Sequence, residues 1–247
     1  MKFAGRIWLS MVLTPITPKQ WHTSNNPVAM LSLLRNADEP LVRLFASACC
    51  RRMWSSLVSP ESREAVRVAE ALADGLAGEE ERRVAERAAN QARALRNHDA
   101  TADAAEAAAA LLRGKVAYSA NKCSTCVSRG QAILAWGDPL LADDSMWEDN
   151  DPHIAAEIVV HAAMLRDIFG DPFASLPVVD ARWLEWNNGT IPQLCTDMYE
   201  FRNFDRMPTL DAHLRAAGCG DSRILKHCAL AEHYRGCWVV DLLLGKR

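Results

Sequence analysis

The sequence predicts an all-α protein, an irregular multi-helix bundle organised around one central hydrophobic helix. Apolar residues recur at steps of three and four along most of the 247-residue chain, which is the period of an amphipathic helix. Twenty of the 56 residues in 65–120 are alanine, the strongest helix former, which predicts an Ala-rich helical middle. No run shows the alternation and β-branched content of a sheet, and only 178–179 is a candidate for a minor strand.

The central hydrophobic helix is predicted near 40–58. Asp38 can cap its start, and Pro40 fits its first turn, where a backbone N–H has no helical partner. An apolar face follows at helical spacing, formed by Leu41, Leu44, Phe45, Ala48, Cys49, Met53, Trp54 and Leu57. Arg43, Arg51 and Arg52 are expected on the side that faces solvent.

Capping and breaking residues delimit the other predicted helices. Asn26-Pro27 and Ser59-Pro60 each pair a capping side chain with a proline in the first turn, and Gly170 and Gly218 end later segments. The segment 172–189 is expected to be irregular. These signals predict further helices over 27–35, 60–73, 79–113, 116–136, 153–169, 192–204, 208–217, 222–230 and 237–244.

The chain is predicted to have two helical regions separated by an acidic loop. Residues 1–18 are expected to be a leader or extension, because their apolar run is short and no small-residue cleavage site follows it. Residues 19–136 form an N-terminal helical region that contains the Ala-rich helices. The loop at 137–152 is rich in acids and turn residues, and 153–247 form a C-terminal helical region that is expected to pack on the N-terminal helices.

Composition indicates a cytoplasmic globular protein. The 28 basic and 31 acidic residues give a net charge of −3 without a concentrated basic block, which disfavours nucleic acid as a partner. No run reaches the roughly 20 apolar residues of a membrane span, so no membrane partner is expected. Eight cysteines in a chain of this length are not the pattern of a disulfide scaffold, and they favour a reducing compartment.

Four stretches carry a resemblance to a known family. They are 21–35 (WHTSNNPVAMLSLLR), 42–54 (VRLFASACCRRMW), 165–173 (LRDIFGDPF) and 216–246, which contains ILKHC and EHYRGCWVVDLLLGK. In this order they resemble a family of paralogous proteins from planctomycete bacteria, over roughly residues 19–247. Ser47 stands where the family pattern carries another cysteine, and Cys123 and Cys126 lie outside that pattern. The family is uncharacterised, so the resemblance implies no activity.

The first candidate metal site is the pair Cys123 and Cys126. This CxxC spacing is half of many zinc sites, because two thiolates across a tight turn can bind one tetrahedral ion. A second CxxC is absent, so the remaining ligands would have to come from distant parts of the chain. The favoured interpretation is therefore two ordinary thiols near a helix end.

The densest candidate metal group is Cys219, His227, His233 and Cys237, with Cys228 among them. All five lie within 19 residues, but their spacing matches no zinc motif. The favoured interpretation is that the cysteines are buried and the histidines bond backbone carbonyls at helix ends. Zinc binding by the first four residues is the alternative.

A third candidate group is His153, Glu157 and His161, which steps of four place on one side of a helix. The spacing is neither HExxH nor a repeated ExxH pair, so the favoured interpretation is a polar strip facing water. A metal or proton-transfer site is the alternative.

These observations favour a non-enzymatic helical interaction or scaffold module, a protein-binding subunit. Nucleotide-binding, hydrolase and kinase motifs are absent, and although a serine–histidine–aspartate triad stays open, no catalytic residue and no cofactor-binding residue is assigned. The first alternative is a structural or hydrolytic zinc protein. The second is an accessory subunit of a nucleic-acid complex, which would use a face bearing Arg82, Arg83, Arg87, Arg93 and Arg96. The partner and the oligomeric state are not determined by the sequence.

Overall fold

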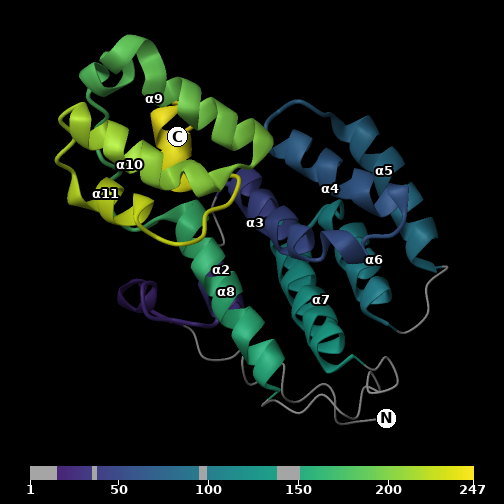
Figure 1. The fold of residues 1–247 in the computed structure, drawn as a ribbon. Coiled ribbons are helices and arrows are strands. Elements are labelled where there is room, and N and C mark those ends of the chain that lie inside the picture. The colour runs from purple at the N-terminus through teal and green to yellow at the C-terminus, as the bar shows by residue number, and fades with distance from the viewer. Residues whose placement is uncertain (1–15, 35–37, 95–98, 138–150) are drawn as a thin grey trace. The chain divides into compact units, whose positions relative to one another are not determined.

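The computed structural model describes residues 16–34, 38–94, 99–137 and 151–247, which form helices joined by turns and contain no strand (Figure 1). The all-α class is therefore confirmed for the described residues, and the strand candidate at 178–179 lies in a segment without regular structure. The chain divides into two compact units, residues 1–165 and residues 166–247. The predicted leader and acidic loop lie mostly outside the described residues.

Unit 1, residues 1–165, contains helices that begin at the capping residues of the sequence. The Asn26 side chain accepts a hydrogen bond from the Ala29 N–H at 3.0 Å, and the Ser59 hydroxyl accepts one from the Ser62 N–H at 3.1 Å. Its described helices are α2 (Pro27–Leu33), α3 (Glu39–Arg52), α4 (Pro60–Ala73), α5 (Glu79–Ala94), α6 (Ala100–Leu111), α7 (Val116–Trp136) and most of α8 (Pro152–Phe169). The predicted tract 79–113 divides into α5 and α6.

The predicted central helix is α3, which packs against α4, α6 and α7 (Figure 1). Phe45 and Cys49 on this helix are fully buried. The helix ends at Arg52, earlier than predicted, and Trp54–Ser56 form a short 3-10 turn instead. The central position of this segment is confirmed, and only its C-terminal boundary differs.

The arginines of α3 are less exposed than the sequence-based expectation, because Arg43 is buried and the side chains of Arg51 and Arg52 are only 23% and 26% exposed. Arg43 is buried and donates a hydrogen bond to the Leu111 carbonyl at 3.2 Å. Arg51 binds the buried carboxylate of Glu70 with two hydrogen bonds of 2.7 and 2.8 Å. The expectation was wrong because hydropathy alone does not show which charged side chains have a charged partner on a neighbouring helix.

The Ala-rich helix α6 lies inside unit 1, against α7 and α5. Most of its residues are buried, although their side chains are small. The buried alanines are Ala100, Ala104, Ala105, Ala107, Ala108, Ala109 and Ala110. Alanine at these positions lets the neighbouring helix backbones approach closely, which explains why this alanine tract is interior and not a solvated stalk.

Unit 2, residues 166–247, packs short helices around one apolar core. It contains the last turn of α8, α9 (Ala181–Phe201), α10 (Met207–Ala216), α11 (Ser222–Cys228) and α12 (Trp238–Leu243). The core includes Ile191, Met198, Leu210, Leu214, Ile224 and Val240. The short apolar helix α12 is buried, as its sequence predicts, because Val239 and Val240 have no exposed surface.

Two details of unit 2 differ from the sequence-based prediction. Helix α9 begins at Ala181, where 172–189 was expected to be irregular, and then breaks at Trp186–Gly189. Asn187, Asn188 and Gly189 have φ of 47°, 58° and 78°, a left-handed conformation that cannot continue a right-handed helix. Helix α11 ends at Cys228, before the predicted end at residue 230, and Asp221 caps its start by accepting a hydrogen bond from the Arg223 N–H at 2.8 Å.

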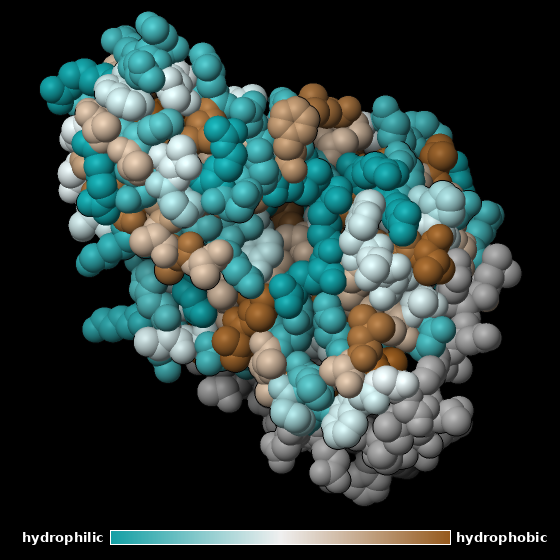
Figure 2. Space-filling model, viewed as in Figure 1, coloured by the Kyte–Doolittle hydropathy of each residue, from teal (hydrophilic) through white to brown (hydrophobic). Residues whose placement is uncertain are grey.

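The surface combines polar side chains with scattered apolar ones, as the face in Figure 2 shows. The described helices include none with the length and apolarity needed to cross a bilayer. All eight cysteines lie in the described residues and are free and buried. Burial of every thiol agrees with the prediction that the cysteines do not form a disulfide scaffold.

Substitution of Gly170 by alanine is expected to destabilise unit 2. Gly170 ends α8 with a φ of +64°, and a Cβ there would lie 3.1 Å from the Trp238 ring. We expect Gly170→Ala to reduce the free energy of unfolding by about 2 kcal/mol, measured by urea titration. The matched control is Gly220→Ala, because Gly220 has open space around it and no positive φ. Equal effects of the two substitutions would contradict the expected strain.

Candidate metal centre

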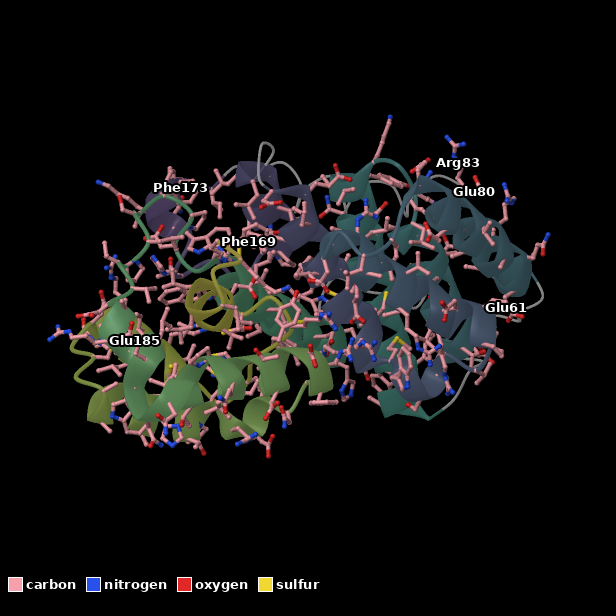
Figure 3. All side chains as sticks on the ribbon, turned by 90° about the horizontal axis from the view of Figure 1, so that it is seen from above. Glu61, Glu80, Arg83, Phe169, Phe173 and Glu185 are labelled. Carbon is pink, nitrogen blue, oxygen red and sulfur yellow. The ribbon has the colours of Figure 1, made fainter. Side chains whose placement is uncertain are left out.

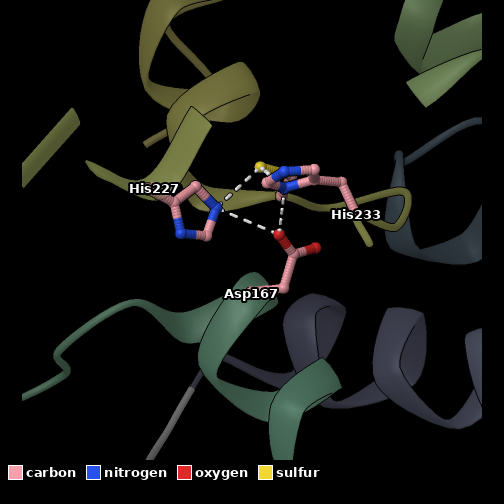
Figure 4. Close-up of side chains that lie close together, drawn as sticks. Asp167, His227 and His233 are labelled. Carbon is pink, nitrogen blue, oxygen red and sulfur yellow. Dashed lines mark hydrogen bonds and ion pairs between the residues drawn. The ribbon is translucent and has the colours of Figure 1, made fainter. Parts of the chain in front are cut away.

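Four potential metal ligands meet inside unit 2: Asp167, His227, His233 and Cys237. All four residues are buried, and their ligand atoms lie within 4.8 Å of one another (Figure 4). The Asp167 Oδ1 is 3.0 Å from the His227 Nε2 and 2.7 Å from the His233 Nδ1. The Cys237 Sγ is 3.2 Å from the His227 Nε2 and 3.7 Å from the His233 Nδ1. Within the described residues this is the one group of this kind.

The four ligands come from four different parts of unit 2. Asp167 lies in the last turn of α8, and His227 lies at the C-terminal end of α11. His233 lies in the connection between α11 and α12, and Cys237 is the residue that precedes α12. Gly236, with a φ of +92°, turns the chain immediately before Cys237.

Further contacts orient the ligand atoms toward a common point. The His233 Nε2 lies 3.2 Å from the Leu230 carbonyl, so a proton on Nε2 leaves Nδ1 directed at the cluster. The Tyr234 N–H donates to the second carboxylate oxygen of Asp167 at 2.8 Å. The backbone N–H groups of Val239 and Val240, at the start of α12, lie close enough to the Cys237 sulfur to lower its pKa. Such supporting contacts are typical of metal sites.

The charges of the cluster depend on what occupies its centre. Burial raises the pKa of Asp167, but the hydrogen bonds from His227 and His233 outweigh it and leave that pKa below its ordinary value. Burial and the negative charge of Asp167 hold the pKa of Cys237 well above its ordinary value. A coordinated cation reverses the second effect, because a thiol bound to a metal loses its proton.

Two chemical states fit these contacts. In one, the Asp167 carboxylate accepts hydrogen bonds from the two imidazoles, and the thiol is neutral. In the other, one carboxylate, one thiolate and two neutral imidazoles supply two negative charges, which neutralise a divalent cation in the buried site. The donor set of oxygen, sulfur and two nitrogens suits zinc.

The distances between the ligand atoms are close to those of a tetrahedral zinc site. With bonds of about 2.0 Å to nitrogen and oxygen and about 2.3 Å to sulfur, tetrahedral ligands lie about 3.3–3.6 Å apart. The two contacts of Cys237, at 3.2 and 3.7 Å, lie just below and just above this range. The two contacts of Asp167, at 3.0 and 2.7 Å, have hydrogen-bond lengths and would lengthen by about 0.3 and about 0.6 Å around an ion.

The structure brings three of the four predicted C-terminal ligands together. His227, His233 and Cys237 belong to the cluster, whereas Cys219 lies outside it in the connection from α10 to α11. The predicted hydrogen bond between a histidine side chain and a backbone carbonyl is present for His233 only. Asp167 was not identified from the sequence, because it lies 66 positions before His233 and no spacing motif links them. The one sequence feature that could have pointed to Asp167 is its position in the stretch 165–173, which carries part of the family resemblance.

Cys123 and Cys126 lie in the middle of α7 and are buried in unit 1. The Cys123 thiol donates a hydrogen bond to the Ala107 carbonyl at 3.2 Å. Burial raises the pKa of Cys126 to about 12 and that of Cys123 well above its ordinary value. Neither cysteine belongs to a group of three potential ligands in the described part of the chain. These thiols therefore fill space in the helical core.

Of the third candidate group, only Glu157 and His161 come together, and the three residues do not form the strip facing water that the sequence suggested. His153 is exposed and contacts the Trp136 ring, whereas Glu157 and His161 are buried. Arg52 donates a hydrogen bond to each carboxylate oxygen of Glu157. His161 Nε2 lies 3.2 Å from that carboxylate, and Nδ1 lies 2.9 Å from the Ser124 hydroxyl.

The arginines proposed for nucleic-acid contact pair mainly with glutamates of their own unit. Arg82 and Arg83 both bind Glu79, and Arg93 binds Glu106 at 2.6 Å. Arg87 lies 3.9 Å from Glu80, and Arg96 lies outside the described residues. Such pairing leaves little of the net positive surface that phosphate binding requires.

Comparison of the chain with protein-family models, curated proteins and solved structures finds no match. The resemblance to the planctomycete family therefore stays a prediction, and the candidate centre is interpreted from its geometry alone.

Replacing Glu157 by glutamine tests the buried ion pair of unit 1. Contacts with His161 and Arg52 outweigh burial and lower the pKa of Glu157 from 4.5 to about 2. Because the unfolded chain takes up this proton first, the carboxylate stabilises the fold above pH 4.5, and the effect is lost as the pH falls toward 2. We expect Glu157→Gln to cost about 2–3 kcal/mol at neutral pH, measured by urea unfolding.

The difference between wild type and Glu157→Gln should shrink when the titration is repeated at lower pH within that window. The control is Glu64→Gln, because the pair of Glu64 with Arg67 is 55% exposed on both sides and contributes little. A difference that stays constant down to pH 2 would show that the charge of Glu157 does not stabilise unit 1.

Proposed function

We propose that residues 166–247 form a structural zinc-binding unit within a non-enzymatic helical interaction module. One observation carries the proposal: Asp167, His227, His233 and Cys237 direct one oxygen, two nitrogens and one sulfur at a common buried point. The spacing of these atoms, the hydrogen bonds that orient them and their combined charge all suit zinc. Membership of the planctomycete family is part of the same proposal and has only the sequence resemblance behind it.

A structural role is favoured over a hydrolytic one by the number and burial of the ligands. A catalytic zinc usually has three protein ligands and keeps a fourth position open for water. Here four side chains offer one ligand atom each, enough to fill all four positions of a zinc ion, and none of the four residues is more than 8% exposed. An ion at this point would join α8, α11 and α12, and it would have no route to a substrate.

The remaining alternative, a nucleic-acid accessory subunit, has no observation in its favour. The proposed role of the whole chain is therefore protein binding by a helical surface. Zinc would hold the fold of unit 2, and unit 1 would supply helix faces for contact.

Metal analysis of protein purified without a histidine tag tests the zinc site. We expect about one equivalent of zinc per chain in the wild type and a large loss in Cys237→Ser and in His233→Ala. The matched control is Cys219→Ser, which also removes a buried thiol but lies outside the cluster and should keep the ion. Cobalt substitution adds a second readout, because a sulfur-to-cobalt absorption band should appear in wild type and Cys219→Ser and be absent in Cys237→Ser.

A wild-type protein that binds no metal after refolding with zinc would contradict the proposal. Zinc retained by Cys237→Ser and lost from Cys219→Ser would place the site elsewhere among the cysteines.

Chelation tests whether the ion is structural. Because the unfolded chain lacks the assembled site, removing zinc should lower the thermal unfolding midpoint of the wild type, and added zinc should restore it. The midpoint of Cys237→Ser should not respond to the chelator. A wild-type midpoint that is the same with and without the chelator would mean that a bound ion does not hold the fold.

A further inference from the structure

Unit 1 carries an open groove along the pair of helices α4 and α5. The hollow has a volume of about 560 Å³. Its apolar lining comes from Pro60 and Val68 of α4 and from Val84, Ala85 and Ala88 of α5. Val84 is 51% exposed, so covering its side chain would remove apolar surface from water, which lowers the free energy. The short side chains of the two alanines would allow the backbone of another helix to come close.

Acidic side chains surround this apolar strip. Four glutamates line the groove, at positions 61, 64, 80 and 81, against one arginine, Arg67. Glu61 forms no ion pair with any described residue, and Glu80 lies 3.9 Å from a largely exposed Arg87, a contact that contributes little. Figure 3 shows Glu61 and Glu80 at the outer side of this helix pair. The groove therefore combines an apolar centre with unmatched negative charge at its edges.

We propose that this groove docks a basic amphipathic helix of a partner protein. The two walls are helices and offer no free strand edge, so the mode that fits is a helix laid in a groove, with apolar residues at steps of three and four. The charge of the lining selects lysine or arginine beside that apolar stripe. An acidic helix would meet like charges at Glu61 and Glu80, and it is excluded by the same argument.

The inference rests on the interaction role proposed above and is independent of the zinc site. If the basic peptide does not bind, the interaction must use another surface than the groove. That result would not bear on the zinc content of unit 2.

Fluorescence anisotropy with a labelled synthetic peptide tests the proposal on the full chain. The probe is a helical peptide with leucines at steps of three and four and lysines flanking the stripe. Two comparison peptides carry glutamate in place of lysine or the same composition in scrambled order. We expect the basic peptide to bind at least about tenfold more tightly than either comparison peptide, with an affinity that falls as salt is added.

Two variants locate the binding. Glu61→Lys/Glu80→Lys changes exposed side chains and should weaken binding of the basic peptide by about tenfold or more. The same variant should bind the acidic peptide, because the charge at the groove edges is reversed. Val84→Asp should weaken binding by a similar factor, because it places a charge in the apolar strip. The matched control is Glu185→Lys/Glu200→Lys on exposed positions of α9, which makes the same change in net charge away from the groove. Circular dichroism shows whether each variant keeps its helices.

Equal binding of the basic and scrambled peptides would overturn the proposal. So would wild-type affinity in both groove variants, or a loss in the α9 control as large as that in Glu61→Lys/Glu80→Lys. Light scattering identifies another occupant, because a wild-type dimer that Val84→Asp converts to a monomer would mean that a second copy of the chain covers the groove.

Discussion

A charge that lies inside a packed helical core must be matched by an opposite charge or by hydrogen bonds, and this constraint organises both units. In unit 1 the matching group is a guanidinium. Arg51 binds Glu70 between α3 and α4, and Arg52 binds Glu157 between α3 and α8. In unit 2 the buried carboxylate of Asp167 contacts two imidazoles and a backbone N–H instead. The same requirement thus gives ion pairs in one unit and a candidate metal centre in the other.

The consequence for unit 2 is that its smallest elements depend on one another. Helices α11 and α12 have seven and six residues, which is too short for either to be stable alone. His227, His233 and Cys237 connect them with α8 through the Asp167 carboxylate. A bound metal ion would add its binding free energy to the stability that the apolar core supplies. At the cluster, such an ion would tie α8, α11 and α12 together at one point.

The helical class and most helix positions could be predicted from the sequence, because periodicity and capping are local properties. Ser59-Pro60 opens α4, and α12 is buried as its apolar composition requires. The helical start of α9 at Ala181 was missed, because a single turn of helix before a break has little periodicity of its own. The break itself, at Trp186–Gly189, lies inside the segment 172–189 that was expected to be irregular. The candidate site was predicted in part. Its C-terminal ligands are close in sequence, whereas Asp167 joins them only through the tertiary fold.

Helix α6 illustrates how composition alone can mislead. Its alanines suggest a low-complexity filler that would tolerate many replacements. Inside unit 1, however, they set the separation between neighbouring helix axes, because α7 and α5 pack directly on them. A larger side chain at Ala107 or Ala108, neither of which has any exposed surface, would have to push whole helices apart. The repetitive segment is therefore expected to evolve slowly at its inward-facing positions and freely only at those that reach water.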